Sequence, residues 1–183
     1  MKLALTPLLM LAGCSQSPEA ANTAAPANDA AAATPAKMIA APEQTSPTKS
    51  YADATAAYNS FARAAAGLGK EKASSAALKR YAELVFKEQS QFGMEFKIAS
   101  AKVSGLLPNP TLSAEQQEGL ETLQQAGGAA FDRAFLAQQI AAHSKMLPVQ
   151  QAFAASREDE ALTAFADRYS RWVQRHLRLA KDI

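Results

Sequence analysis

The sequence predicts an all-α protein, built as an antiparallel bundle of four main helices with one short extra connecting helix. Two observations carry this prediction. From Tyr51 onward, apolar side chains recur at three- and four-residue spacing, which is the period of an amphipathic helix. No alternating apolar–polar stretch of the kind that forms a half-buried strand is present. Short joins between long helices favour an antiparallel bundle, and one longer crossover is expected around 105–128.

The N-terminus, "MKLALTPLLMLAGCSQS", has the pattern of a secretory signal: one lysine, then a short apolar run that ends in small residues at Cys14. "LAGC" resembles the bacterial lipobox. This resemblance implies that the signal peptide 1–13 is removed and that Cys14 is lipidated. Ser15 resembles the outer-membrane sorting choice of Gram-negative lipoproteins, so we expect a lipid-anchored protein that faces the periplasm. The alternative is a hydrophobic N-terminus with a chance cysteine.

Residues 14–48 are predicted to be a disordered tether. They consist mainly of Ala, Pro, Thr, Ser and Asn, and such a composition buries too little apolar surface to offset the entropy of ordering the chain. The helical domain is therefore expected to cover 49–183.

Each expected helix has its own signals. The first covers about 51–68, and the second starts after Ser74 or Ser75 and runs to about 104, where "GLLPNP" ends it. The capping box Ser113…Gln116 opens the short connecting helix, and the glycine pair at 127–128 is expected to end it. The last two helices are expected at about 129–155 and 158–182.

Polar residues lie within the apolar arcs of three of these helices. A step of about 100° per residue puts Asp132, Gln139 and His143 in the middle of one apolar arc. His176 lies among aromatic and aliphatic positions of the last helix, and Glu88 lies within the arc of the second. The sequence therefore predicts a polar core cluster whose members are Glu88, Asp132, Gln139, His143 and His176.

Three stretches are distinctive: "AAFDRAFLAQQIAAH", "LTAFADRYSRWVQRHLRLA" and "KEKASSAALKRYAELVF". Through them, residues 55–182 resemble the bacterial "domain of unknown function 4142", a family described as predicted outer-membrane proteins related to ferritin-like bundles. It implies a ferritin-like bundle in which Asp132, His143 and His176 occupy recurring polar positions. Where the family usually has Asp-His on the second helix, this chain has Lys87-Glu88.

Three interpretations of the polar cluster stay open. Its groups hydrogen-bond one another and fix helix register, or Glu88, His143 and His176 bind one zinc or iron ion, or they perform acid–base chemistry. A di-iron site is not expected, because Ile140 and Val173 stand where Glu-x-x-His pairs need glutamates. No catalytic residue is assigned, since neither a nucleophile elbow nor a phosphate-binding glycine loop occurs. No cofactor is expected outside the metal alternative.

A basic surface stripe is predicted on the last helix, formed by Arg168, Arg171, Arg175 and Arg178. It suits anionic lipid headgroups or polyanionic glycans of the envelope, or it is simply a solvated face. The formal net charge of +2 argues against nucleic acid as a partner. We expect a non-enzymatic periplasmic lipoprotein with an envelope-maintenance, stress or binding role, and the alternative is a metal-binding or redox bundle.

Overall fold

The computed structural model describes residues 45–183, and the all-α prediction is confirmed there. Five helices follow one another and no strand occurs in this range: α1 (Pro47–Lys72), α2 (Ala76–Ser100), α3 (Ala114–Gln125), α4 (Gly128–Ser156) and α5 (Glu160–Lys181). None of these helices is both long and apolar enough to cross a lipid bilayer. The predicted signal peptide, the lipidated Cys14 and nearly all of the predicted tether lie outside the described residues.

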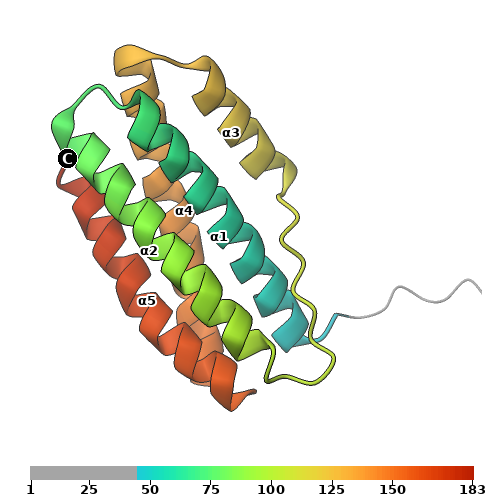
Figure 1. The fold of residues 1–183 in the computed structure, drawn as a ribbon. Helices are drawn as coiled ribbons and strands as arrows, with labels where there is room; N and C mark the ends of the chain where they lie inside the picture. The colour runs from blue at the N-terminus through green and yellow to red at the C-terminus, as the bar shows by residue number, and fades with distance from the viewer. Residues whose placement is uncertain (1–44) are drawn as a thin grey trace, which may run out of the picture. The chain divides into compact units, whose positions relative to one another are not determined.

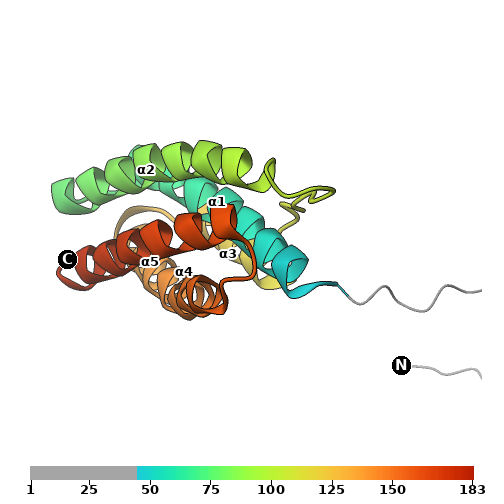
Figure 2. The same cartoon turned by 90° about the horizontal axis from the view of Figure 1, so that it is seen from below.

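The four long helices pack around a common interior as two helical hairpins. The turns at 73–75 and 157–159 join α1 to α2 and α4 to α5, and α1 contacts α4 while α2 contacts α5. Figure 1 shows this arrangement, with α3 outside it on the side away from α5, and α3 contacts α1 and α4. From below, Figure 2 shows the α1–α2 hairpin lying over the α4–α5 hairpin. The expected crossover is the segment that contains α3.

Side-chain caps fix where the helices begin. Ser46, Ser75 and Asp159 accept hydrogen bonds from the backbone N–H three residues on, and Ser113 with Gln116 forms the predicted capping box. Helix α1 begins four residues earlier than expected, because Ser46 caps it and a proline follows in the first turn, where its missing N–H costs nothing.

Two predicted boundaries near glycine and proline were wrong in detail. Helix α2 ends at Ser100 rather than near 104, before the "GLLPNP" segment. Gly127 precedes the first turn of α4 as its N-cap and Gly128, with a φ of 55°, begins that helix, so the glycine pair starts α4 instead of ending α3. Helix α4 continues through Pro148, as the expected span of about 129–155 requires, and the Pro148 side chain is exposed to solvent.

The interior consists of two apolar clusters, with polar side chains on α4 between them. One cluster gathers Tyr51, Phe165 and Tyr169, and the other gathers Leu78, Phe131 and Phe135. These clusters draw on all four long helices, so the fragment 45–183 is expected to fold by itself.

Candidate functional site

Glu88 on α2 and His176 on α5 form the centre of the predicted polar cluster. The Nε2 atom of His176 lies 2.6 Å from Oε2 of Glu88, which also accepts bonds from the Arg175 guanidinium, at 2.5 Å, and from the indole N–H of Trp172. Burial opposes ionisation of Glu88, but the hydrogen bonds from Arg175 and His176, together with the charge of Arg175, outweigh it and lower the pKa of this carboxyl. Glu88 is therefore a carboxylate that joins α2 to α5.

His143 on α4 lies beside His176, with their ring centroids 5.6 Å apart. Its Nδ1 atom is 2.6 Å from the backbone oxygen of Gln139, one turn earlier. Both imidazoles are fully buried. Burial lowers the pKa of His143 to about 3, helped by the neighbouring His176, and lowers the pKa of His176 to about 4 against the opposing effect of Glu88. Both histidines are therefore neutral at pH 7.

The partners of the two rings define their tautomers. A backbone carbonyl and a carboxylate only accept hydrogen bonds, so His143 carries its proton on Nδ1 and His176 carries its proton on Nε2. The other ring nitrogens, Nε2 of His143 and Nδ1 of His176, are acceptors with no hydrogen-bond partner among residues 45–183. The buried Gln139 amide and the Tyr58 hydroxyl are also unpaired there, and the Tyr58 ring meets His143 edge-on at 5.8 Å.

Asp132 does not belong to this cluster, and its prediction as a core residue was wrong. It lies at the surface near the start of α4, where its carboxylate accepts bonds from the backbone N–H of Ser74, at 2.9 Å, and from the Ser74 hydroxyl, at 2.5 Å. These bonds lower the pKa of Asp132. The position of Asp132 around the helix axis was not enough to predict where its side chain lies. The α1–α2 turn comes close to this end of α4, and Ser74 in that turn donates hydrogen bonds to the carboxylate.

Two further polar groups in the interior were not part of the predicted cluster. The Gln89 amide oxygen accepts bonds from the Tyr169 hydroxyl at 2.7 Å and from the Asn59 amide at 2.8 Å, which ties α1, α2 and α5 together. Farther along the bundle, Gln150 is bonded to α1 through the side chains of Tyr51 and Thr55. Gln89 could have been predicted from the sequence, because it is an amide residue at a core-facing position of α2, directly after Glu88.

A cleft of about 680 Å³ lies between α1, α3 and α4 and is the second candidate site. Its inner wall is largely apolar and includes Tyr58, Phe61, Met146 and Val149. Its rim is polar and includes acidic side chains from α1 and α3 together with Lys145 of α4. This cleft could not be predicted from the sequence, because it depends on how far α3 stands from the four long helices.

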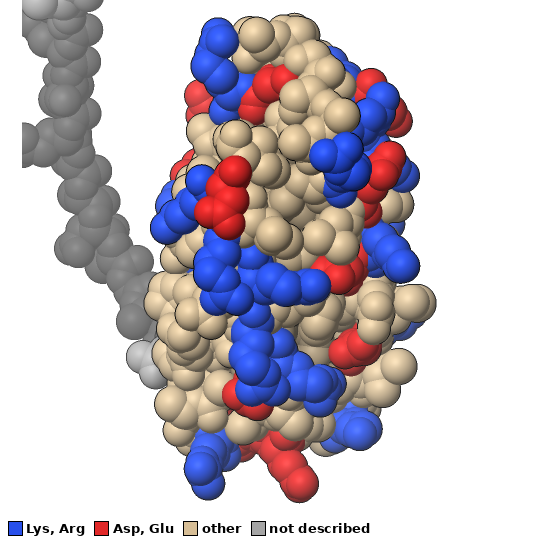
Figure 3. Space-filling view, turned by 90° about the vertical axis from the view of Figure 1, so that its left-hand side faces the viewer, with Lys and Arg blue, Asp and Glu red and all other residues tan. Residues whose placement is uncertain are grey.

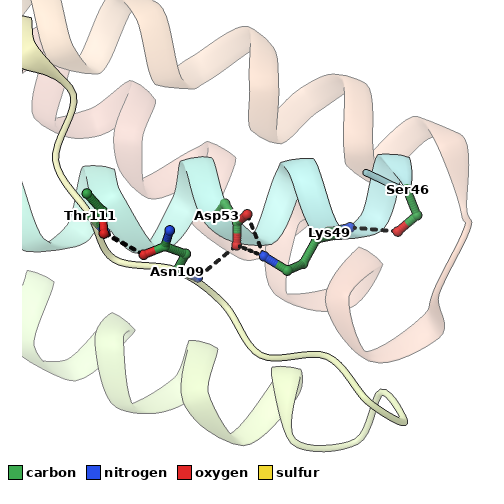
Figure 4. Close-up of polar contacts among 5 residues, drawn as sticks. All are labelled: Ser46, Lys49, Asp53, Asn109 and Thr111. Atoms are coloured by element: carbon green, nitrogen blue, oxygen red, sulfur yellow. Dashed lines mark hydrogen bonds and ion pairs between the residues drawn. The ribbon is translucent and has the colours of Figure 1, made fainter. Parts of the chain in front are cut away.

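Figure 4 shows that the segment before α3 is fastened to α1 by polar contacts. Asp53, Asn109 and Thr111 of this group also line one edge of the cleft. The Asp53 carboxylate accepts bonds from the ammonium of Lys49, at 2.6 Å, and from the backbone N–H of Asn109, at 2.7 Å. Burial opposes ionisation of Asp53, but these bonds outweigh it and lower its pKa. Asn109 in turn accepts bonds from the backbone and hydroxyl of Thr111. This edge of the cleft is therefore built from a defined loop.

The family model for "Domain of unknown function (DUF4142)" matches residues 18–183, which is most of the chain. The chain belongs to the DUF4142 family. No curated protein and no solved structure is significantly similar to it. Membership in DUF4142 confirms the family resemblance of the sequence motifs and assigns no activity to the two candidate sites.

In this DUF4142 domain, the residues proposed as metal ligands lie together but are engaged with one another. Glu88 is hydrogen-bonded directly to His176, and the His143 ring lies beside the His176 ring, with centroids 5.6 Å apart. Among residues 45–183, no group of three or more His, Cys, Asp or Glu side chains is arranged to hold a metal ion. Among the buried atoms of the proposed ligands, those that could bind a metal ion and have no hydrogen-bond partner within residues 45–183 are two unprotonated imidazole nitrogens.

The basic stripe of the DUF4142 domain is present on α5, but part of its charge is paired. Arg168 lies 3.6 Å from Glu95, Arg171 lies 2.7 Å from Asp167, and Arg175 binds Glu88. Arg178 is exposed and forms no ion pair within the described residues. The stripe is therefore both a surface feature and part of the seam between α2 and α5.

Proposed function

We propose that this DUF4142 protein is a non-enzymatic, lipid-anchored protein of the periplasm whose helical domain binds an apolar ligand in the cleft between α1, α3 and α4. The lipid anchor is supported by the "LAGC" motif and the small residues before it. The binding role rests on one observation, the cleft of about 680 Å³ with an apolar inner wall. Envelope maintenance or stress protection is the context that such a tethered binding domain suits.

The size and lining of the cleft support a ligand site. Small-molecule sites typically measure about 300–1,000 Å³ and combine an apolar lining with a few polar groups that orient the ligand. Here Phe61 and Met146 provide apolar surface, whereas Asn109, Gln116 and Gln138 provide polar groups. This combination favours a compact apolar molecule, or part of an acyl chain, over a highly charged metabolite.

Helix α3 covers the cleft and is anchored mainly at its C-terminal end. Leu123 is fully buried there, and Lys72 donates to the backbone oxygens of Leu123 and Gln124 at 2.8 and 2.6 Å. Gln138 donates to the backbone oxygen of Gly119. Toward its N-terminal end, an ion pair between the exposed side chains of Glu115 and Lys145 connects α3 to α4. An exposed ion pair contributes little stability, so this end is the natural entrance for a ligand.

Filling the cleft tests the proposal. Ala141 is exposed on α4 and lines the cleft, so Ala141→Trp is expected to weaken binding of the neutral apolar dye N-phenylnaphthylamine to the fragment 45–183 by about tenfold or more. Dye fluorescence measures the affinity. Ala152→Trp, at an exposed α4 position that does not line the cleft, is the matched control and should bind like the parent. Equal affinities in all three proteins would place dye binding outside the cleft.

A metal-binding bundle is the second candidate function, and one observation favours it. His143 and His176 each keep one buried, unprotonated nitrogen without a hydrogen-bond partner among residues 45–183, and unprotonated imidazole is a good ligand for zinc and iron. Glu88 would be the third ligand through Oε1, because the three hydrogen bonds that it accepts all go to Oε2.

Elemental analysis separates the two functions. For the fragment 45–183, purified without a metal-binding tag and incubated with zinc or iron, the apolar-ligand function predicts no retained metal. Near-stoichiometric metal that disappears in the double variant His143→Ala, His176→Ala would instead establish the metal site. In that case a chelator should also lower the melting temperature of the parent fragment, because bound metal stabilises the folded state.

The ferritin-like arrangement also belongs to the proposal. It is supported by the order of contacts, in which the α1–α2 and α4–α5 hairpins meet through α1 with α4 and α2 with α5. The hairpins are connected by one long crossover that contains α3, as in ferritin-like bundles with a single long connection.

A further inference from the structure

We propose that the surface formed by α2 and α5 docks on a lipid bilayer that carries anionic headgroups. The α2–α5 face is defined here by Arg80, Lys87, Met94 and Ile98 of α2 together with Arg168, Arg171, Arg175 and Arg178 of α5. Its two helices contact each other directly. This inference is independent of the ligand cleft, which lies between other helices.

Charge is distributed unevenly over the helical domain. Helix α2 carries four Lys or Arg and three Glu, and α5 carries five Lys or Arg and two acidic residues, so the pair has an excess of four positive charges. Helix α3, on the other side of the domain in Figure 1, carries three Glu and no basic residue. A polarised molecule of this kind turns its basic side toward an anionic surface.

Figure 3 shows the side of the domain that lies on the left in Figure 1, and Lys and Arg side chains gather across its middle. Some of these cations are locally paired, as Arg168 is with Glu95. Lys87 and Arg178 are exposed and form no ion pair within residues 45–183. These two therefore supply charge that is available to a partner.

Two apolar side chains distinguish a lipid surface from a hydrophilic polyanion as the partner. Met94 and Ile98 are each 64% exposed, and they lie one turn apart on α2. Glu95, next to Met94 in the sequence, faces α5 through its ion pair with Arg168, whereas Met94 borders a hollow between α2 and α1. Apolar side chains beside basic ones are the composition of an interfacial membrane contact, in which cations meet headgroups and apolar groups enter the boundary with the acyl chains. A glycan polyanion offers Met94 and Ile98 no comparable apolar partner.

The test measures binding of the fragment 45–183 to phosphatidylcholine vesicles with and without phosphatidylglycerol, by co-sedimentation at low and high salt. We expect binding only to the anionic vesicles, with a loss at high salt because the attraction between charges is screened. The double variant Lys87→Gln, Arg178→Gln should bind about tenfold more weakly or worse, since each cation near such a surface contributes about 1 kcal/mol.

A matched control removes the same charge elsewhere. Arg133→Gln on α4 with Arg157→Asn in the α4–α5 turn also deletes two exposed cations, and asparagine tolerates the left-handed backbone of residue 157, where φ is 54°. This control should bind anionic vesicles within about twofold of the parent. A loss as large as that of the Lys87 and Arg178 variant would mean that net charge alone drives binding, and the proposal would be overturned.

Met94→Ser with Ile98→Ser tests the apolar part without changing charge. Both side chains are exposed, so the variant should keep its fold, which circular dichroism checks, and it should bind anionic vesicles several-fold more weakly. Unchanged binding would contradict the lipid contact. Absence of vesicle binding by the parent fragment would also overturn the proposal, and heparin binding sensitive to Lys87→Gln, Arg178→Gln would then identify a soluble polyanion as the partner.

Discussion

Lowering the pH from 7 to 5 is expected to reduce the free energy of unfolding of the fragment 45–183 by on the order of 4 kcal/mol, through its two histidines. Both are buried as neutral rings, with pKa values of about 3 for His143 and about 4 for His176. An unfolded histidine titrates near pH 6.5. Below that pH the unfolded chain binds two protons that the folded domain does not, so the equilibrium moves toward unfolding.

The surrounding groups determine the pH range. Glu88 and Arg175 face His176, while His176 and Tyr58 face His143. The carboxylates of Asp53, Glu88 and Asp132 have lowered pKa values, so the stability they contribute is present above their unfolded pKa, near 4, and is lost as the pH falls below it. Tyr58 stays neutral between pH 5 and 7, because burial raises its pKa above the usual value for tyrosine. The interval from pH 7 to 5 therefore reports mainly on the histidines.

Urea unfolding at half-unit pH steps measures this dependence. The single variants His143→Gln and His176→Gln should each lose about half of the decrease between pH 7 and 5, even though both are less stable than the parent at pH 7. A pH dependence that is the same in the parent and in both variants would show that the imidazoles are not buried as neutral groups.

Gly69→Ala is expected to lower the free energy of unfolding by about 1–3 kcal/mol, even though alanine is the better helix former. Gly69 lies near the end of α1, where side chains of both α2 and α4 pack against it. A Cβ atom there would lie 2.7 Å from the Cβ of Ala82 and 2.7 Å from Cζ of Phe135. Ala82 is fully buried and its Cβ is fixed to the backbone of α2, so relief requires the helices to separate.

Gly67 provides the control on the same helix. Its added Cβ would come no closer than 3.8 Å to the Phe86 ring, which is ordinary contact. Gly67→Ala should therefore stabilise the domain by up to about 1 kcal/mol, through helix propensity alone. Thermal and urea unfolding of both variants measure the difference. Stabilisation by both substitutions would mean that α1, α2 and α4 are not packed this closely at Gly69.

Local signals in the sequence predicted much of the fold. Helical periodicity identified the four long helices, and the Ser113 capping box marked the short one. Pro47 and Ser46 lay within the predicted tether and yet begin α1, because the tether was defined by composition over a long stretch and a cap is a feature of one or two residues. The glycine pair at 127–128 was ambiguous for a similar reason, since glycine suits either end of a helix.

The candidate sites depended far more on tertiary structure. The sequence correctly put His143 and His176 inside, because a helix of 3.6 residues per turn fixes the direction of each side chain around its own axis. It did not determine the partners, because these depend on how far one helix is shifted along another. Helix packing brought Glu88 to His176 across 88 positions of the chain, and it left Asp132 at the surface beside Ser74. The cleft beneath α3 arose the same way, from the distance between helices, which no single helix encodes.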